Sequence, residues 1–162
     1  MPEPRRGLGV DNHLCALAYL SRSNIEEKAA ALSSGIEDIL VTARRNNHRL
    51  GITGALLLSR GWFTQVLEGS AEAVETIFEA IQCDPRHRDV TVLYYKPVEE
   101  RNFPRWSMAF VGLPDSVGEA TSIDGVLANP DSIEADPIGQ DLVKILTALI
   151  QRQENVNVEN DL

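Results

Sequence analysis

The sequence predicts an α+β fold: a ferredoxin-like sandwich, in which two helices cover one face of a β-sheet, followed by a C-terminal helical extension. Two observations lead to this prediction. Apolar residues recur at helical spacing in two segments, and five shorter segments have the alternating or continuous apolar character of strands. These segments follow one another in the order β-α-β-β-α-β-β, which is the split βαβ arrangement with one added strand.

The folded part of the chain begins with a predicted strand at 13–21, HLCALAYLS, in which Leu17, Tyr19 and Ser21 share one face. A helix follows after a polar stretch. Ser34 and Glu37 have the spacing of a capping box, so we expect the helix to begin at Ser34 and to end near Gly51. Its apolar face has the i, i+3, i+4, i+7 spacing, in Ile36, Ile39, Leu40 and Ala43.

Two strands come next, at 52–59 and 62–69, and the short Arg60-Gly61 spacer between them predicts a hairpin. Ser70 caps a second helix, whose apolar face again has helical spacing, in Val74, Ile77, Phe78 and Ile81. Two further strands are expected at 90–98 and 105–113. Because the central strands are apolar on both sides, we expect both faces of the sheet to be covered.

The C-terminal third is expected to supply this second cover. Residues 114–137 are rich in Pro, Gly, Asp and Ser and are interpreted as a linker or cap, whereas 138–153 predicts an amphipathic helix. This helix either docks on the bare sheet face of its own chain or binds a partner or a second copy. The ends of the chain, 1–12 and 154–162, are predicted to be a disordered leader and a disordered tail.

Composition narrows the class of function. The net charge of −9 argues against a general nucleic-acid binder, which needs a basic face. Cys15 and Cys83 lack metal-ligand spacing, so both are interpreted as reduced thiols in the core and no metal site is expected. The sequence has no signal-peptide pattern and no run of about 18 apolar residues, which predicts a cytoplasmic protein that does not enter a membrane.

Several polar residues fall where the pattern expects a dry interior. Gln65 lies between the apolar Phe63 and Leu67 on one strand face, and an unpaired amide there would cost about 1–3 kcal/mol. Tyr19 lies on the inward face of the first strand, and Asn47 near the end of the first helix. Each has a structural explanation: a core tyrosine, a helix terminus, or a glutamine satisfied by water or an edge strand.

The predicted topology also allows a binding site. The groove between the two helices would have Tyr19 and Gln65 on its floor and Asn47 on its rim, with Arg86 and His87 nearby unless they form only a solvated turn. Such a groove suits a flat ligand with an apolar body and a polar edge. No GxGxxG motif, nucleophile–base pair or carboxylate pair is found, so no enzyme constellation is predicted.

Five segments, in this order and spacing, resemble the BLUF family of blue-light sensors, which bind FAD non-covalently: AYLSRS, RNNHRLGITGALLL, GWFTQVLEG, DPRHRDV and RNFPRWSMAFVG. The resemblance covers 13–113, which we therefore expect to be a flavin-binding BLUF domain of the short, stand-alone type. It implies the ferredoxin-like fold with the flavin ring between the two helices. FMN and riboflavin are alternative cofactors.

The resemblance also implies roles for single residues. Tyr19 matches the photoactive electron and proton donor, and Gln65 matches the switch amide between that tyrosine and the flavin. One of Trp106 and Met108, which complete the photoactive set, is expected near Gln65. The expected cofactor-binding residues are Tyr19, Ser21, Ile36, Ile39, Asn46, Asn47, Phe63, Gln65, Ile77, Arg86 and His87.

The function implied is a blue-light photoreceptor, not an enzyme. Light-driven electron and proton transfer from Tyr19 to flavin leaves the Gln65 amide in a new hydrogen-bond state, which shifts the flavin absorption to the red. The signal is expected to pass in trans to a separate effector protein, from a homo-oligomer. Two other readings are a light-independent, small-molecule-binding regulatory module on the same scaffold and a small flavin enzyme, which lacks a recognisable base or nucleophile for a second substrate.

Overall fold

The structure is a computed structural model that describes residues 13–25, 29–59, 61–112, 143–148 and 150–151. The predicted leader, linker and tail lie outside these residues. Within them, the chain forms the expected order of elements, with five strands in one sheet and two helices, α1 and α2, between them. The α+β, ferredoxin-like fold is therefore confirmed.

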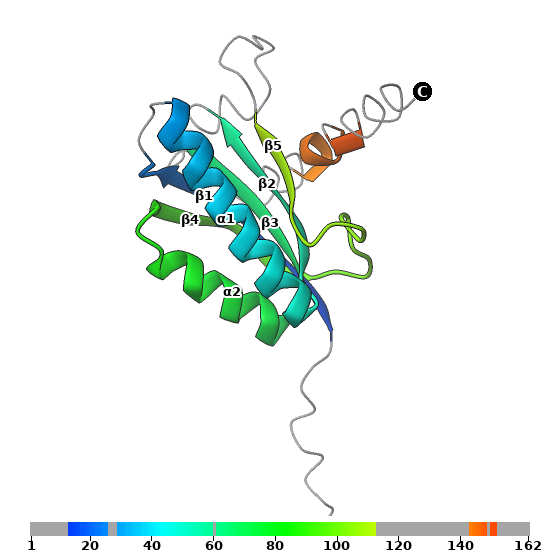
Figure 1. Cartoon of the computed structure of the whole chain (residues 1–162). Coiled ribbons are helices and arrows are strands. Elements are labelled where there is room, and N and C mark those ends of the chain that lie inside the picture. The colour runs from blue at the N-terminus through cyan, green and yellow to red at the C-terminus, as the bar shows by residue number, and fades with distance from the viewer. Residues whose placement is uncertain (1–12, 26–28, 60, 113–142, 149, 152–162) are drawn as a thin grey trace, which may run out of the picture.

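The sheet has the strand order β4-β1-β3-β2-β5 (Figure 1). β3 pairs antiparallel with β1 and with β2, β4 pairs antiparallel with β1, and β5 pairs parallel with β2. The hairpin between β2 and β3 is confirmed, and Gly61 has the positive φ of 78° that tight hairpin turns require. The strands are β1 Leu14–Ser23, β2 Thr53–Ser59, β3 Trp62–Ser70, β4 His87–Pro97 and β5 Ala109–Gly112.

Both helices, α1 (Ala29–Leu50) and α2 (Ala71–Cys83), lie over the same face of the sheet, as Figure 1 shows. Their apolar sides pack with the inward residues of the strands, including Leu17, Tyr19 and Leu67. Ser70 caps α2 as predicted, because its hydroxyl accepts a hydrogen bond from the Ala73 amide. The predicted start of α1 is wrong. The helix is already formed at Ala29, because the run AAAL favours helix more strongly than Ser34 favours a cap.

The opposite face of the sheet is covered by helical residues near the C-terminus, at 143–148 and 150–151. Leu146 is fully buried and Ile150 is 6% exposed, and they pack in one apolar cluster with residues of β1, β2 and β3. The members from those strands are Ala16, Ala18, Leu20, Ala55, Leu57 and Val66. Of the two alternatives for this helix, the structure therefore has docking on the sheet of its own chain.

Three further expectations are corrected. The predicted strand at 105–113 is formed only from Ala109, because the residues before it make turns rather than ladder pairs. β4 begins at His87, three residues earlier than expected. Cys83 is exposed at the end of α2, whereas Cys15 is buried.

No helix among the described residues has the length and apolar character needed to cross a membrane.

Candidate functional site

A pocket lies between α1 and α2, above the sheet. It encloses about 560 Å³, including space open to solvent. By surface area its lining is mostly apolar, with several polar side chains among the lining residues, which is the composition typical of small-molecule sites. The apolar lining is Ile39, Ala43, Leu56, Ile77, Ala80 and Ile81, and the polar lining is Thr42, Asn46, Asn47, Gln65, Asp84, Arg86 and His87.

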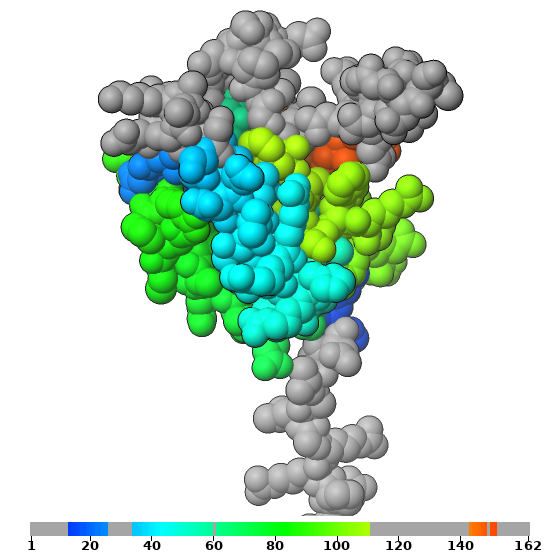
Figure 2. Space-filling view, viewed as in Figure 1, coloured from blue at the N-terminus to red at the C-terminus, as the bar shows by residue number. Residues whose placement is uncertain are grey.

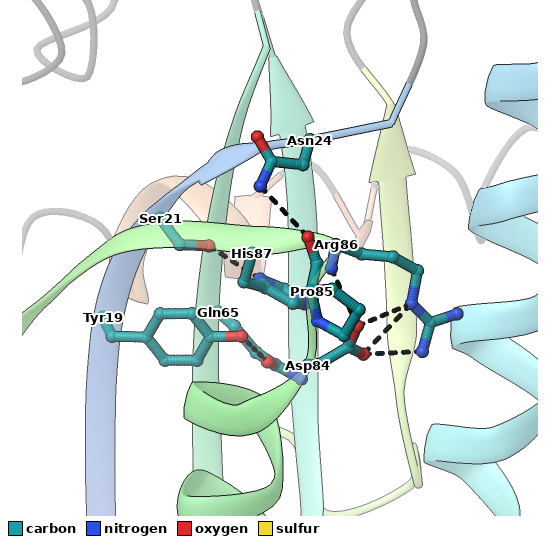
Figure 3. A network of polar contacts seen from close by, with 8 residues as sticks. All are labelled: Tyr19, Ser21, Asn24, Gln65, Asp84, Pro85, Arg86 and His87. Carbon is teal, nitrogen blue, oxygen red and sulfur yellow. Dashed lines mark hydrogen bonds and ion pairs between the residues drawn. The ribbon is translucent and has the colours of Figure 1, made fainter.

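Tyr19 and Gln65 are the buried pair beside this pocket. They are direct Cα partners in the β1–β3 ladder, so their side chains point to the same sheet face. The Tyr19 hydroxyl donates a hydrogen bond to Gln65 Oε1, as Figure 3 shows. Burial raises the pKa of Tyr19 well above its ordinary value, and the nearby Asp84 carboxylate raises it further. The hydroxyl therefore remains a proton donor at neutral pH.

The other end of the Gln65 amide is also engaged. Gln65 Nε2 donates to Met108 Sδ at 3.3 Å, and Met108 is buried. Trp106 is 37% exposed, so Met108 is the member of the Trp106/Met108 pair that contacts the glutamine in this structure. One amide thus joins a tyrosine from β1 to the residue that precedes β5.

Asn47 links α1 to the same segment before β5. Asn47 Nδ2 donates to the Ser107 carbonyl at 2.8 Å, and Arg44 Nε donates to the Met108 carbonyl at 3.1 Å. Asn47 is fully buried, yet its Oδ1 has no hydrogen-bond partner among the described residues. A buried acceptor left unpaired is costly, and because Asn47 is a lining residue of the pocket, its oxygen is available to accept from a ligand with a donor.

Asp84 and Arg86, both in the pocket lining, form an ion pair with Arg86 Nη2 2.6 Å from Asp84 Oδ2 (Figure 3). Burial alone would raise the pKa of Asp84, but hydrogen bonds from the Arg86 side chain and amide, with the Arg86 charge, hold it below its usual range. The carboxylate thereby fixes the guanidinium in place. This arrangement is more than the solvated turn that Arg86 and His87 would otherwise form.

His87 closes one wall of the pocket. Its Nδ1 is 2.7 Å from Ser21 Oγ, and its ring packs against Phe63 with centroids 4.7 Å apart. Burial lowers the pKa of His87 to about 4, and the charge of Arg86 adds to this, although Asp84 opposes it. The imidazole is therefore neutral at pH 7. Ser21 and Phe63 support the pocket through His87 rather than lining it.

His87 makes stability depend on pH. Its folded-state pKa lies below the unfolded value, so the unfolded chain takes up the proton first as pH falls. We expect His87 to account for a loss of about 2 kcal/mol in the free energy of unfolding between pH 7 and pH 5. Denaturant titrations should show this dependence reduced in His87→Gln and retained in His48→Gln, the same change at an exposed position. Equal pH dependence in both variants would contradict the assignment.

The structure brings together most of the residues that the sequence predicted. Of the expected cofactor-binding residues, seven line the pocket: Ile39, Asn46, Asn47, Gln65, Ile77, Arg86 and His87. Tyr19 reaches it through Gln65, and Ile36 packs in the apolar layer under the helices without lining it.

Some lining residues were missed. Ala43 lies on the helix face already predicted from its spacing with Ile39, and Leu56 is the ladder partner of Gln65 on β2. Asp84 was also missed. The only feature of the sequence that could have indicated it is its position two residues before Arg86.

The fold and the pocket define a class of protein: a small ferredoxin-like domain with a buried Tyr–Gln pair beside a pocket between its two helices. Residues 14–109 match the family described as BLUF, sensors of blue-light using FAD. The chain belongs to the BLUF family. Domains of this family are photosensors that bind flavin, so the matched region is a sensor and not a catalytic unit.

Individual proteins agree with this assignment. The chain is 37% identical over 99 residues to photoactivated adenylate cyclase subunit beta of Euglena longa, a match that covers 60% of the chain and 11% of that relative. It thus spans about a tenth of the length of such curated relatives.

Among solved structures, the BLUF protein BlrB in its dark state has a TM-score of 0.66 at 30% identity, covering 83% of this chain and 98% of BlrB. BlsA in its photo-activated state has a TM-score of 0.63 at 34% identity, covering 84% and 94%.

The residues present fit a flavin. Its flat apolar ring suits walls of isoleucine and leucine, and the N–H of its polar edge is the kind of donor that the unpaired Asn47 Oδ1 requires. The Arg86 guanidinium, held by Asp84 in the pocket lining, can face the electronegative ring edge.

Proposed function

We propose that this protein is a blue-light photoreceptor that binds FAD non-covalently between α1 and α2, with Gln65 as its switch. One observation carries the proposal: a single buried amide accepts from Tyr19 and donates to Met108. An amide suits a switch, because one end accepts and the other donates, and exchanging the two adds no charge.

The binding roles follow from the lining of the pocket. Ile39 and Ile77, with Ile36 beneath, pack the ring, while Asn47 and Arg86 hold its polar edge. Asn46 and His87 complete the wall, and Ser21 and Phe63 orient His87. Flavin, when bound, absorbs the blue light and accepts an electron and a proton. FMN and riboflavin share the ring that these residues recognise.

Tyr19 and Gln65 then act as one unit. The Tyr19 hydroxyl releases its proton toward Gln65 Oε1, and the amide rotates or tautomerises before the proton and electron return to Tyr19. After rotation, Oε1 instead of Nε2 faces Met108 Sδ. Oxygen and sulfur are both acceptors there, so the present contact is lost and the segment that carries Met108 must repack.

The output is a population shift between two packings, with no substrate converted. Met108 is followed directly by β5, so repacking at Gln65 reaches the edge of the sheet. We propose that this change is read in trans by a separate effector protein, and that the photoreceptor is a homo-oligomer. The cyclase names among the relatives support an effector of signalling type.

Tyr19→Phe tests this proposal. Removing only the hydroxyl takes away the proton donor to Gln65, so we expect bound flavin with nearly all of the reversible red shift lost. Absorption spectra before and after one fixed dose of blue light give the readout. Tyr95→Phe, which removes an exposed hydroxyl hydrogen-bonded to Glu75, should shift like the wild type. A normal shift in Tyr19→Phe would exclude the tyrosine as donor.

A further inference from the structure

Glu68 is a buried acidic residue that the flavin site does not use. It follows Gln65 by three residues on β3, so the two side chains point to opposite faces of the sheet. Glu68 is completely buried, and its carboxylate accepts from the backbone amides of Asn102 and Phe103, each at 2.8 Å. A buried carboxylate is tolerated only with such partners. Its two hydrogen bonds to backbone amides hold the turn at Asn102 and Phe103 in place.

Arg101 fastens the same turn to the ends of three elements. Its guanidinium donates to the Gly51 carbonyl after α1, to Thr53 Oγ1 on β2 and to the Glu68 carbonyl on β3, at 2.8–3.0 Å. The position of 101–103 is therefore set by the Glu68 side chain from outside the turn and by the side chain of Arg101 within it. Glu68 and Arg101 together fix this turn although it has no ladder partner of its own.

The segment that Glu68 holds touches both faces of the sheet. Phe103 is 2% exposed and belongs to the apolar cluster that contains Leu146 and Ile150 of the C-terminal helix. Five residues later, Met108 is buried on the other face against Gln65. In Figure 2 this yellow-green segment lies between α1 (cyan) and the C-terminal helical residues (orange).

We propose that Glu68 is a positioning residue that couples the two faces: its carboxylate holds the 102–103 turn so that movement of Met108 is passed to Phe103 and thus to the C-terminal helix. This inference rests on the proposed switching of Gln65. Without the hydrogen bonds from Glu68, the turn changes its own conformation when Met108 moves, and the C-terminal helix no longer responds to light.

Glu68→Gln is the variant that tests it. The substitution keeps the size of the side chain but replaces one acceptor oxygen with an NH₂ group, which then faces a backbone N–H donor. Hydrogen exchange is measured on the flavin-loaded protein in the dark and in blue light. We expect the red shift to remain, and the light-minus-dark difference over 143–151 to be lost. The matched control is Glu100→Gln, the same change at an exposed site in this segment.

The outcomes separate the two proposals. If wild-type protein shows no red shift, the proposed function is wrong; if Glu68→Gln shifts and keeps the wild-type difference at 143–151, only the Glu68 inference is overturned. If Glu68 had a purely structural role, Glu68→Gln would speed hydrogen exchange over 143–151 equally in the dark and in light, and this result would also overturn the inference.

If Glu68→Gln does not fold, the wild-type protein still tests the inference. The Asn102 and Phe103 amides must exchange at least about tenfold more slowly than those of Glu99 and Glu100. Equal rates would refute the proposed role of the Glu68 hydrogen bonds in holding this turn.

Discussion

Gln65→Leu is expected to bind flavin and to lose the reversible red shift completely. Leucine has nearly the volume of glutamine, so the floor of the pocket stays filled, but it neither accepts from Tyr19 nor donates to Met108. The Tyr19 hydroxyl is then buried without a partner, which should lower the free energy of unfolding by about 1–3 kcal/mol. Absorption spectroscopy under blue light and denaturant unfolding measure the two effects.

The control for this substitution is Gln82→Leu, the same change at an exposed position of α2. It should leave both the red shift and the unfolding free energy near the wild-type values. A full red shift in Gln65→Leu would mean that the spectral change arises elsewhere in the pocket. Loss of bound flavin instead would make Gln65 a binding residue first and leave its switching role unsupported.

Leu146→Ala is expected to destabilise the protein by about 2–5 kcal/mol while leaving the red shift in place. Leu146 is fully buried against the sheet face that the two long helices do not cover, so truncation leaves a cavity there. Tyr19 and Gln65 point to the other face and keep their contacts. Equilibrium unfolding gives the stability, and the light-induced difference spectrum reports on the site.

Lys144→Ala serves as the control on the same helix, because Lys144 is exposed. It should change the unfolding free energy by no more than about 0.5 kcal/mol. If Leu146→Ala had no effect on stability but dissociated an oligomer, the helix would pack on a partner in solution. That result would contradict the docking on its own sheet.

The sequence predicted the arrangement of the fold well because local signals agreed with the global pattern. The β2–β3 hairpin was marked by Gly61 between two apolar runs, and α2 by Ser70 before a regular apolar face. Boundaries were less predictable where two local preferences competed. At α1, a plausible capping box lost to an alanine-rich run, so the helix began earlier than Ser34.

The region before β5 shows a different limit. The alternation of Trp106, Met108 and Phe110 predicted a strand. The residues directly before Ala109 instead accept hydrogen bonds from α1 and β2. Ser107 and Met108 accept from α1 side chains, and the Trp106 carbonyl accepts from the Gly54 amide. Such partners lie more than 50 residues away in the chain, so periodicity does not reveal them. The same distance hid the choice between Trp106 and Met108.

The site divides in a similar way. Gln65 was identifiable from physics, because a glutamine between Phe63 and Leu67 on an inward face demands a partner. Asn47 and Arg86 each had an ordinary structural explanation; the predicted groove made them candidates, and their match to family motifs gave them binding roles. Asp84 and Glu68 were not predicted as functional, since their significance lies in what they hold: the Arg86 guanidinium and the 102–103 turn.

The visible absorption spectrum of the purified protein, recorded before and after blue light, decides whether this chain is a flavin photoreceptor. We expect a flavin spectrum that shifts to the red and relaxes in the dark. A protein that stays colourless after addition of FAD would contradict the binding of flavin in the α1–α2 pocket. A yellow protein whose spectrum does not shift would contradict the switch formed by Tyr19 and Gln65.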